Sequence, residues 1–151
     1  EFRRVLFRSY VKAYDGIALR YFNVYGPGEQ NKGIMASVAY QMVQKKLKGE
    51  EIKLFPKKPQ RDFVYVKDVV SANIHAFENF ETLKGRHYEV GSGTARTFED
   101  VMNILNIPFE YHTEDMIPNG YQFYTCSNKS KWMTGWKSKW SLEDGLKDYD
   151  L

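Results

Sequence analysis

The chain has 151 residues, of which 42% are hydrophobic and 16% aromatic, so it is long and apolar enough to bury the core of one ordinary domain. A single cysteine excludes a disulfide framework. Together with only three scattered histidines, it also excludes a Cys/His zinc cluster, so no metal site is predicted. No apolar run approaches the roughly 18 residues that a membrane span needs, so no membrane partner is expected.

The first nine residues, EFRRVLFRS, resemble the translation of a sequencing-library adapter. The alternative is a short arginine-rich arm that binds phosphates or a membrane surface. We treat residues 1–9 as a non-native segment and expect the native chain to begin further upstream. Without its three arginines and one glutamate, the chain carries 19 basic and 18 acidic side chains. This near balance predicts no nucleic-acid partner.

Strands and helices alternate along the rest of the chain. Residues 10–15 are expected to end a helix that stops at Gly16, and the apolar run 17–22 predicts a buried strand. Turn residues follow over 23–28, and apolar residues at spacings of three and four predict a helix over 33–47.

Short apolar runs predict four further strands, at 51–55, 63–66, 87–90 and 109–112. Capping residues predict three further helices: one over 69–79 after Asp68, one from Phe98 to about Leu105 after Thr97, and a last one opened by Ser141–Asp144. The alternation of strands and helices indicates an α/β fold.

The segment that follows the first strand is a candidate ligand site. The loop at the carboxyl end of a strand is where open α/β sheets bind ligands, and this loop leads into a helix N-terminus near Gly33 that favours anions. The alternative is an ordinary connecting loop with a Gly-Pro turn.

Two motifs carry a resemblance. RYFNVYGP at 20–27 and RDFVYVKD at 61–68 resemble the extended short-chain dehydrogenases/reductases, a family that acts on nucleotide sugars with NAD or NADP. KGIMASVA at 32–39 is similar to the ADP-heptose 6-epimerases within that family. The resemblance implies that residues 10–151 form the C-terminal part of a Rossmann-type domain, with the last parallel strands and a smaller α/β substrate-binding part.

The resemblance also implies roles for individual residues. Lys32 matches an acid/base group close to the cofactor, with a solvated loop lysine as the alternative. Val24 matches a cofactor contact made through the backbone. Six positions match substrate contacts: Asn23, Ile34, Gln41, Phe55, Arg61 and Tyr121.

The chemistry of Arg61 suits such a role, because a guanidinium offers phosphate a permanent charge and a bidentate fork. Gln41 could equally lie on a plain surface, and Phe55 in an ordinary core. The sequence departs from the family at Ile34, where a polar residue is common, and at Gly28, where arginine is common. The loop 56–60 is also short and basic.

Two family signatures are absent from the sequence. No tyrosine is followed by lysine four residues later, and Gly91-Ser92-Gly93 lacks the third glycine of a dinucleotide fingerprint, so we interpret it as a turn. Most of the NADP or NAD site is therefore expected in a missing N-terminal part, and the fragment alone is expected to be inactive.

By resemblance, the parent protein is expected to be a cytoplasmic, homo-oligomeric epimerase that inverts carbon six of ADP-heptose. The first alternative is another nucleotide-sugar epimerase or a 4,6-dehydratase. The second is a non-catalytic module that binds sugar nucleotides.

Overall fold

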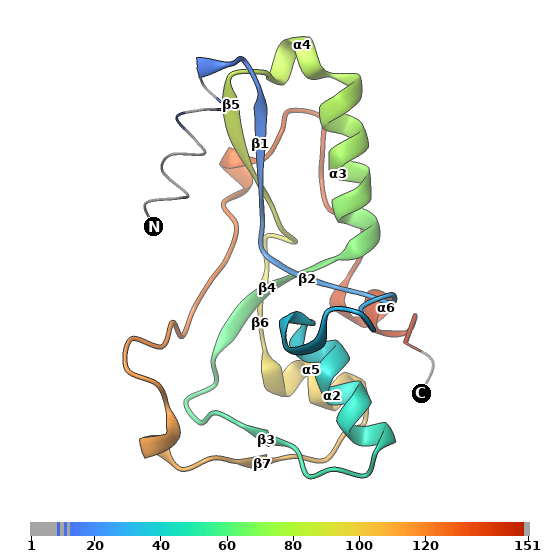
Figure 1. Ribbon diagram of the computed structural model, residues 1–151, viewed down its shortest axis with the longest axis vertical. Coiled ribbons are helices and arrows are strands. Elements are labelled where there is room, and N and C mark those ends of the chain that lie inside the picture. The colour runs from blue at the N-terminus through green and yellow to red at the C-terminus, as the bar shows by residue number, and fades with distance from the viewer. Residues whose placement is uncertain (1–8, 10, 12, 150–151) are drawn as a thin grey trace.

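Residues 17–25 form an extended segment that bends at Phe22, so that its two halves pair with different strands (Figure 1). The computed structural model describes residues 9, 11 and 13–149, so the segment 1–9 predicted to be non-native lies outside the described part except for Ser9. Strand β1 (Ile17–Tyr21) confirms the predicted strand and pairs in parallel with β5 (Arg86–Val90). The chain then continues past Phe22 as β2 (Asn23–Tyr25), which turns to a new partner.

The prediction of a turn over residues 23–28 is wrong for its first three residues. Strand β2 pairs in parallel with β4 (Gln60–Tyr65), whose other edge holds antiparallel β6 (Ala95–Thr97). The β2 backbone therefore finds its partners about 40 residues along the chain, which no local pattern of turn residues could show. The strand ends before Gly26, where a Cβ would lie 2.5 Å from Cγ1 of Val66.

The two remaining strands are only two residues long each. The third parallel pair consists of β3 (Lys53–Leu54) and β7 (Glu110–Tyr111). The helical elements are η1 (Gly33–Met35), α2 (Val38–Leu47), α3 (Val66–Glu78), α4 (Phe80–Leu83), α5 (Phe98–Ile104), η2 (Glu114–Met116), η3 (Lys129–Lys131) and α6 (Leu142–Leu146). No helix of the described part is long and apolar enough to cross a membrane.

The helix predicted over 33–47 is divided in two. A single turn, η1, is separated from α2 by Ala36 and Ser37, and the Ser37 hydroxyl caps α2 by accepting a hydrogen bond from the Tyr40 N–H at 3.1 Å. The loop that carries Lys32 is thereby anchored at the start of a regular helix.

Asp68 does not cap the following helix as predicted, because α3 already begins at Val66. Its carboxylate is buried and accepts hydrogen bonds from the Ser138 hydroxyl and from the N–H groups of Lys139 and Trp140, at 2.7–3.1 Å. The carboxylate therefore fastens the segment before α6 to the base of α3.

The two other capping predictions are confirmed. Thr97 and Asp100 exchange side-chain-to-backbone hydrogen bonds in a capping box that opens α5. Ser141 accepts from the Asp144 N–H at the start of α6.

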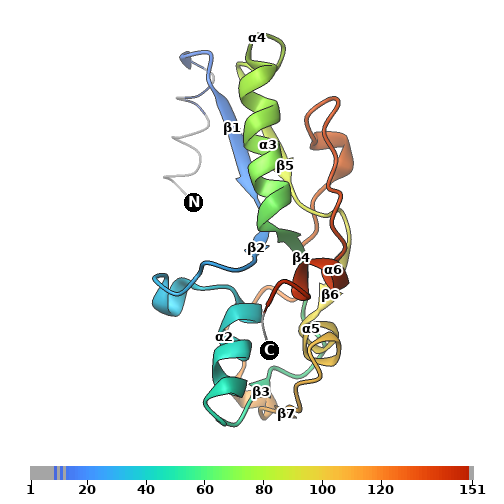
Figure 2. The ribbon, with the colours of Figure 1, turned by 90° about the vertical axis from the view of Figure 1, so that its right-hand side faces the viewer.

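Two hydrophobic clusters lie on either side of the bend in the first strand. One forms where α3 packs beside β1 and β5, in the upper part of Figure 1, and includes Val64 and Val90. The other, in the lower part of Figures 1 and 2, joins α2, α5 and α6 around Tyr25 and Tyr65. Strands β2 and β4 contribute side chains to both clusters, so the candidate site residues on these strands rest on a packed base.

Candidate functional site

The carboxyl ends of β1 and β5 meet at a turn held by one buried carboxylate. Tyr21 pairs with Val90, and the following Gly91-Ser92-Gly93 is a turn, as predicted. Asp62, with no exposed surface, accepts hydrogen bonds there from the Ser92 N–H and hydroxyl (2.6 and 2.7 Å) and the Gly93 N–H (3.1 Å). It also accepts from the Ser127 N–H at 2.8 Å. Asp62 therefore joins three separate segments beside Arg61.

Arg61 is oriented by two aromatic rings. Its guanidinium carbon lies 5.3 Å from the ring centre of Tyr121 and 5.6 Å from that of Phe98, and Nη1 donates to the Gln60 carbonyl at 2.8 Å. The Phe55 ring stacks edge-on against Tyr121 at 5.1 Å. The structure thus brings three of the predicted substrate residues, Phe55, Arg61 and Tyr121, into one half-buried cluster.

Tyr121 reaches this cluster because its segment runs beside the start of β4. The Gln60 N–H donates to the Phe123 carbonyl at 2.7 Å, and the Thr125 N–H donates to the Gln60 carbonyl at 3.2 Å. These bonds link segments about 60 residues apart, and no pattern in either segment alone predicts them.

Lys32, Ile34 and Gln41 form a second group at η1 and the start of α2. The Lys32 Nζ lies 3.3 Å from a Glu29 oxygen, and its side chain is 50% exposed, so the ammonium is half open to solvent. Ile34 is 92% exposed. Gln41 donates through Nε2 to the carbonyls of Ala36 (2.8 Å) and Ile34 (3.3 Å), so its amide braces η1.

A shallow hollow of about 360 Å³ lies against this second group, and Ile34 and Gln41 are among the residues that line it. In the described part of the chain, no hydrogen bond or ring contact joins the Lys32 group to the Arg61 cluster. The two sets of predicted residues are therefore held independently of each other.

Asn23 and Val24 lie on β2. The Asn23 side chain is exposed, opposite Phe63 in the register. The Val24 side chain packs against the cluster around Val64 and Val90, so its backbone, rather than its side chain, is what a ligand could reach.

The C-terminal segment supplies residues that the sequence analysis missed. The Tyr25 hydroxyl donates towards the Leu142 carbonyl at 3.3 Å, and the Gly26 N–H donates to the Tyr149 hydroxyl oxygen at 2.9 Å. Burial raises the pKa of both phenols, so both stay protonated and able to donate. Together with Glu29 and Asp62, Tyr149 shapes the site without matching any sequence signal beyond its residue type.

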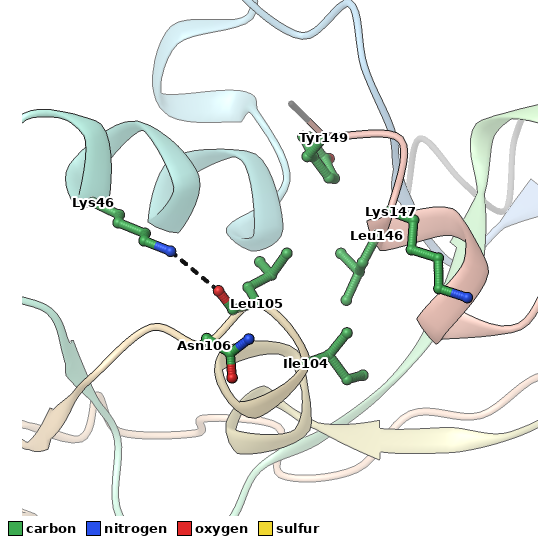
Figure 3. Close-up of a pocket in the computed structure, with 7 residues that line it drawn as sticks. All are labelled: Lys46, Ile104, Leu105, Asn106, Leu146, Lys147 and Tyr149. Atoms are coloured by element: carbon green, nitrogen blue, oxygen red, sulfur yellow. Dashed lines mark hydrogen bonds between the residues drawn. The ribbon is translucent and has the colours of Figure 1, made fainter. Parts of the chain in front are cut away.

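A separate hollow of about 300 Å³ lies where α2 and α5 meet the C-terminal segment (Figure 3). Lys46 bridges one side by donating from Nζ to the Leu105 carbonyl at 3.3 Å, and Tyr149 lies at another. None of the predicted site residues lines it. Within residues 9, 11 and 13–149, no group of three or more His, Cys, Asp or Glu could hold a metal ion.

Comparison with known proteins assigns the chain to a protein family. A sequence model of the NAD dependent epimerase/dehydratase family matches residues 4–91, more than half of the chain. The chain belongs to this family. The α/β fold of the chain is accordingly that of the Rossmann-type extended short-chain dehydrogenases/reductases, as the sequence motifs predicted.

Two individual relatives share one specific enzyme name within this family. The ADP-L-glycero-D-manno-heptose-6-epimerase of Brachyspira hyodysenteriae is 35% identical over 143 residues, which cover 88% of this chain and 44% of that one. The crystal structure of the Helicobacter pylori enzyme of the same name matches with a TM-score of 0.82 and 31% identity, over 98% of this chain and 48% of that one.

A second activity appears among the solved structures. The UDP-glucose 4-epimerase of Thermotoga maritima, solved with UDP-glucose, matches with a TM-score of 0.78 and 30% identity, over 95% of this chain and 49% of that one. The chain spans about half the length of each of these three relatives.

Proposed function

We propose that the chain is the substrate-binding part of a nucleotide-sugar epimerase that inverts carbon six of ADP-heptose with NADP or NAD. The observation that carries the proposal is the placement of Arg61 between the rings of Tyr121 and Phe98. This cluster adjoins Asp62 and the carboxyl ends of β1 and β5, the edge at which α/β sheets bind ligands.

Arg61 would bind the diphosphate of the nucleotide sugar. Its guanidinium is already oriented by the two rings and by the Gln60 carbonyl, so little side-chain entropy is lost when a phosphate binds. Phe55 and Tyr121 would offer ring surface to the same ligand, and Asn23, Ile34 and Gln41 would contact it from β2, η1 and α2.

Lys32 would serve as an acid/base group. Oxidation of a sugar hydroxyl to a ketone and reduction from the other face require one group to take the hydroxyl proton and another to return it. The half-exposed ammonium of Lys32 can hold or donate a proton at that oxygen, and the second group would lie in the part of the protein that precedes this chain.

The residues present fit the nicotinamide cofactor that the family name implies. The exposed amide of Asn23 and the ammonium of Lys32 suit the hydroxyl and phosphate groups of a dinucleotide, and Val24 offers backbone. The chemistry that the cofactor supplies when bound is reversible hydride transfer. The proposal includes a cytoplasmic location and a homo-oligomer, whose size sedimentation of the complete protein would measure.

The test uses the complete protein, with its upstream sequence recovered from the source DNA. We expect turnover of ADP-heptose, and at least a hundredfold loss of kcat in Lys32→Met, because general acid/base catalysis contributes about 10²–10⁴-fold. Lys137→Met, at an exposed lysine in the segment before α6, is the matched control and should retain activity.

Three results would contradict parts of the proposal. Turnover of UDP- or dTDP-sugars alone would replace the heptose substrate. Unchanged turnover in Lys32→Met would remove the acid/base role of that lysine. Nucleotide-sugar binding without turnover of any of these sugars would favour the non-catalytic module.

A further inference from the structure

The loop between β2 and α2 is built around one buried carboxylate. Glu29 is only 4% exposed, and both of its oxygens are engaged. One oxygen accepts from the Ser37 N–H at 2.7 Å and lies 3.3 Å from the Lys32 Nζ. The other accepts from the Ser37 hydroxyl at 2.6 Å and from the Tyr149 hydroxyl at 3.4 Å.

Two of these partners tie Glu29 to fixed parts of the fold. Ser37 is the N-cap of α2, so Glu29 is attached to the first turn of a ten-residue helix. The Tyr149 hydroxyl accepts from the Gly26 N–H and donates its own hydrogen to Glu29. Residues from the start of the loop, its end and the C-terminal segment thus hold the carboxylate in place.

The third partner, Lys32, differs because it reaches the surface. Its side chain is 50% exposed, whereas that of Glu29 is 5% exposed. A buried carboxylate is costly to desolvate, and its other partners are neutral donors. Among the described residues, Lys32 is therefore the cation that compensates its charge. The charged and titratable groups that face Glu29 among the described residues are Lys32 and Tyr149.

We propose that Glu29 is the positioning residue of Lys32: the buried carboxylate fixes where the lysine ammonium lies at the surface of the loop between β2 and α2. This inference rests on the acid/base role of Lys32 proposed above, and it adds a residue that touches neither substrate nor cofactor. The ammonium keeps its remaining N–H groups for a ligand, while the buried carboxylate of Glu29 sets their position from the protein side of a half-exposed contact.

The first test measures the reactivity of Lys32 directly in the complete protein. Limited acetylation with acetic anhydride, read for each lysine by mass spectrometry, should modify Lys32 several-fold more slowly than Lys48, because an ammonium held by a carboxylate is withheld from acylation. In Glu29→Gln, Lys32 should become as reactive as Lys48. Equal reactivity of the two lysines in the unaltered protein would overturn the proposal without the need for any variant.

A matched variant separates positioning from simple support of the fold. Ser37→Ala removes the cap of α2 and one hydrogen bond to Glu29, but it leaves the contact between the carboxylate and Lys32. We expect a lower Tm in this variant with Lys32 still protected from acetylation. Loss of that protection in Ser37→Ala, to the same degree as in Glu29→Gln, would mean that Glu29 acts only through loop stability.

The second test is a double-mutant cycle on kcat. Glu29→Gln should lower kcat about tenfold or more in the otherwise unaltered enzyme and should have no further effect on the residual kcat of Lys32→Met. An undiminished effect in the Lys32→Met background would overturn the proposal. If Lys32→Met itself retains full turnover, the proposed function of Lys32 fails, and acetylation still reports whether Glu29 holds it.

Discussion

The N–H of Gly26 donates a 2.9 Å hydrogen bond to the hydroxyl oxygen of Tyr149, a residue 123 positions further along the chain. The same hydroxyl donates to Glu29 at 3.4 Å, so one phenol from the C-terminal segment connects the beginning and the middle of the loop that carries Lys32. This pair explains why a segment after the last helix bears on the candidate site.

Tyr149→Phe should destabilise the protein by about 1–3 kcal/mol, because the buried Gly26 N–H is left without an acceptor. The free energy of unfolding, measured by urea denaturation, checks the value. Tyr111→Phe is the control, because the Tyr111 hydroxyl bonds Glu99 at the exposed surface and its removal should cost far less. Equal losses in the two variants would contradict the anchoring role of Tyr149.

Gly91→Ala should destabilise the turn that follows β5. A Cβ at this position would lie 2.5 Å from both an Asp62 oxygen and the Ser127 hydroxyl, and the hydrogen bonds of Asp62 leave it no room to move. Overpacking of this kind costs about 1–3 kcal/mol. Gly16→Ala, where the nearest atom lies at 3.5 Å, is the matched control and should leave the Tm nearly unchanged.

Acid should weaken the attachment of the C-terminal segment. Hydrogen bonds from Lys67, at 2.7 Å, and from Tyr65 lower the pKa of Asp148. A carboxyl whose folded pKa is lowered stabilises the fold above its unfolded pKa of about 3.9, and this stabilisation is lost as the pH falls through the folded value.

Asp148→Asn tests this directly through urea midpoints at pH 7 and at about pH 3. The variant should be less stable than the unaltered protein at pH 7 and should lose less stability on acidification. Asp115→Asn, an exposed aspartate on η2, should follow the unaltered protein at both values. A parallel pH dependence of all three proteins would show that Asp148 does not contribute.

Arg61→Lys should weaken the binding of ADP to the complete protein about tenfold or more. An ammonium lacks the planar fork that stacks between Tyr121 and Phe98 and can bond two phosphate oxygens at once. Isothermal titration calorimetry with ADP measures the loss. Arg86→Lys, at the exposed start of β5, is the control, and an equal affinity in both variants would place the diphosphate elsewhere.

The sequence predicted those features that depend on neighbouring residues. The capping box at Thr97, the N-cap at Ser141, the buried strand after Gly16 and the turn at Gly91 each follow from residues a few positions apart. The fold class could also be predicted, because the α/β alternation and the two family motifs are patterns of neighbouring residues. Local chemistry sufficed for the two helix starts because their hydrogen-bond partners lie within the same turn. The strand and the turn could be predicted from residue type alone, although their partners, β5 and Asp62, are distant in sequence.

Only the tertiary structure decided what the buried carboxylates and the end of the first strand do. Asp68 looked like a cap and instead holds residues 138–140, Asp62 joins segments 30 and 65 positions away, and Glu29 is reached by Tyr149. Residues 23–25 contain turn formers yet pair as β2, because β4 supplies their backbone partners. A buried polar group takes whichever partner the packed chain brings to it, and that choice is set by contacts too distant in sequence for any local pattern to encode.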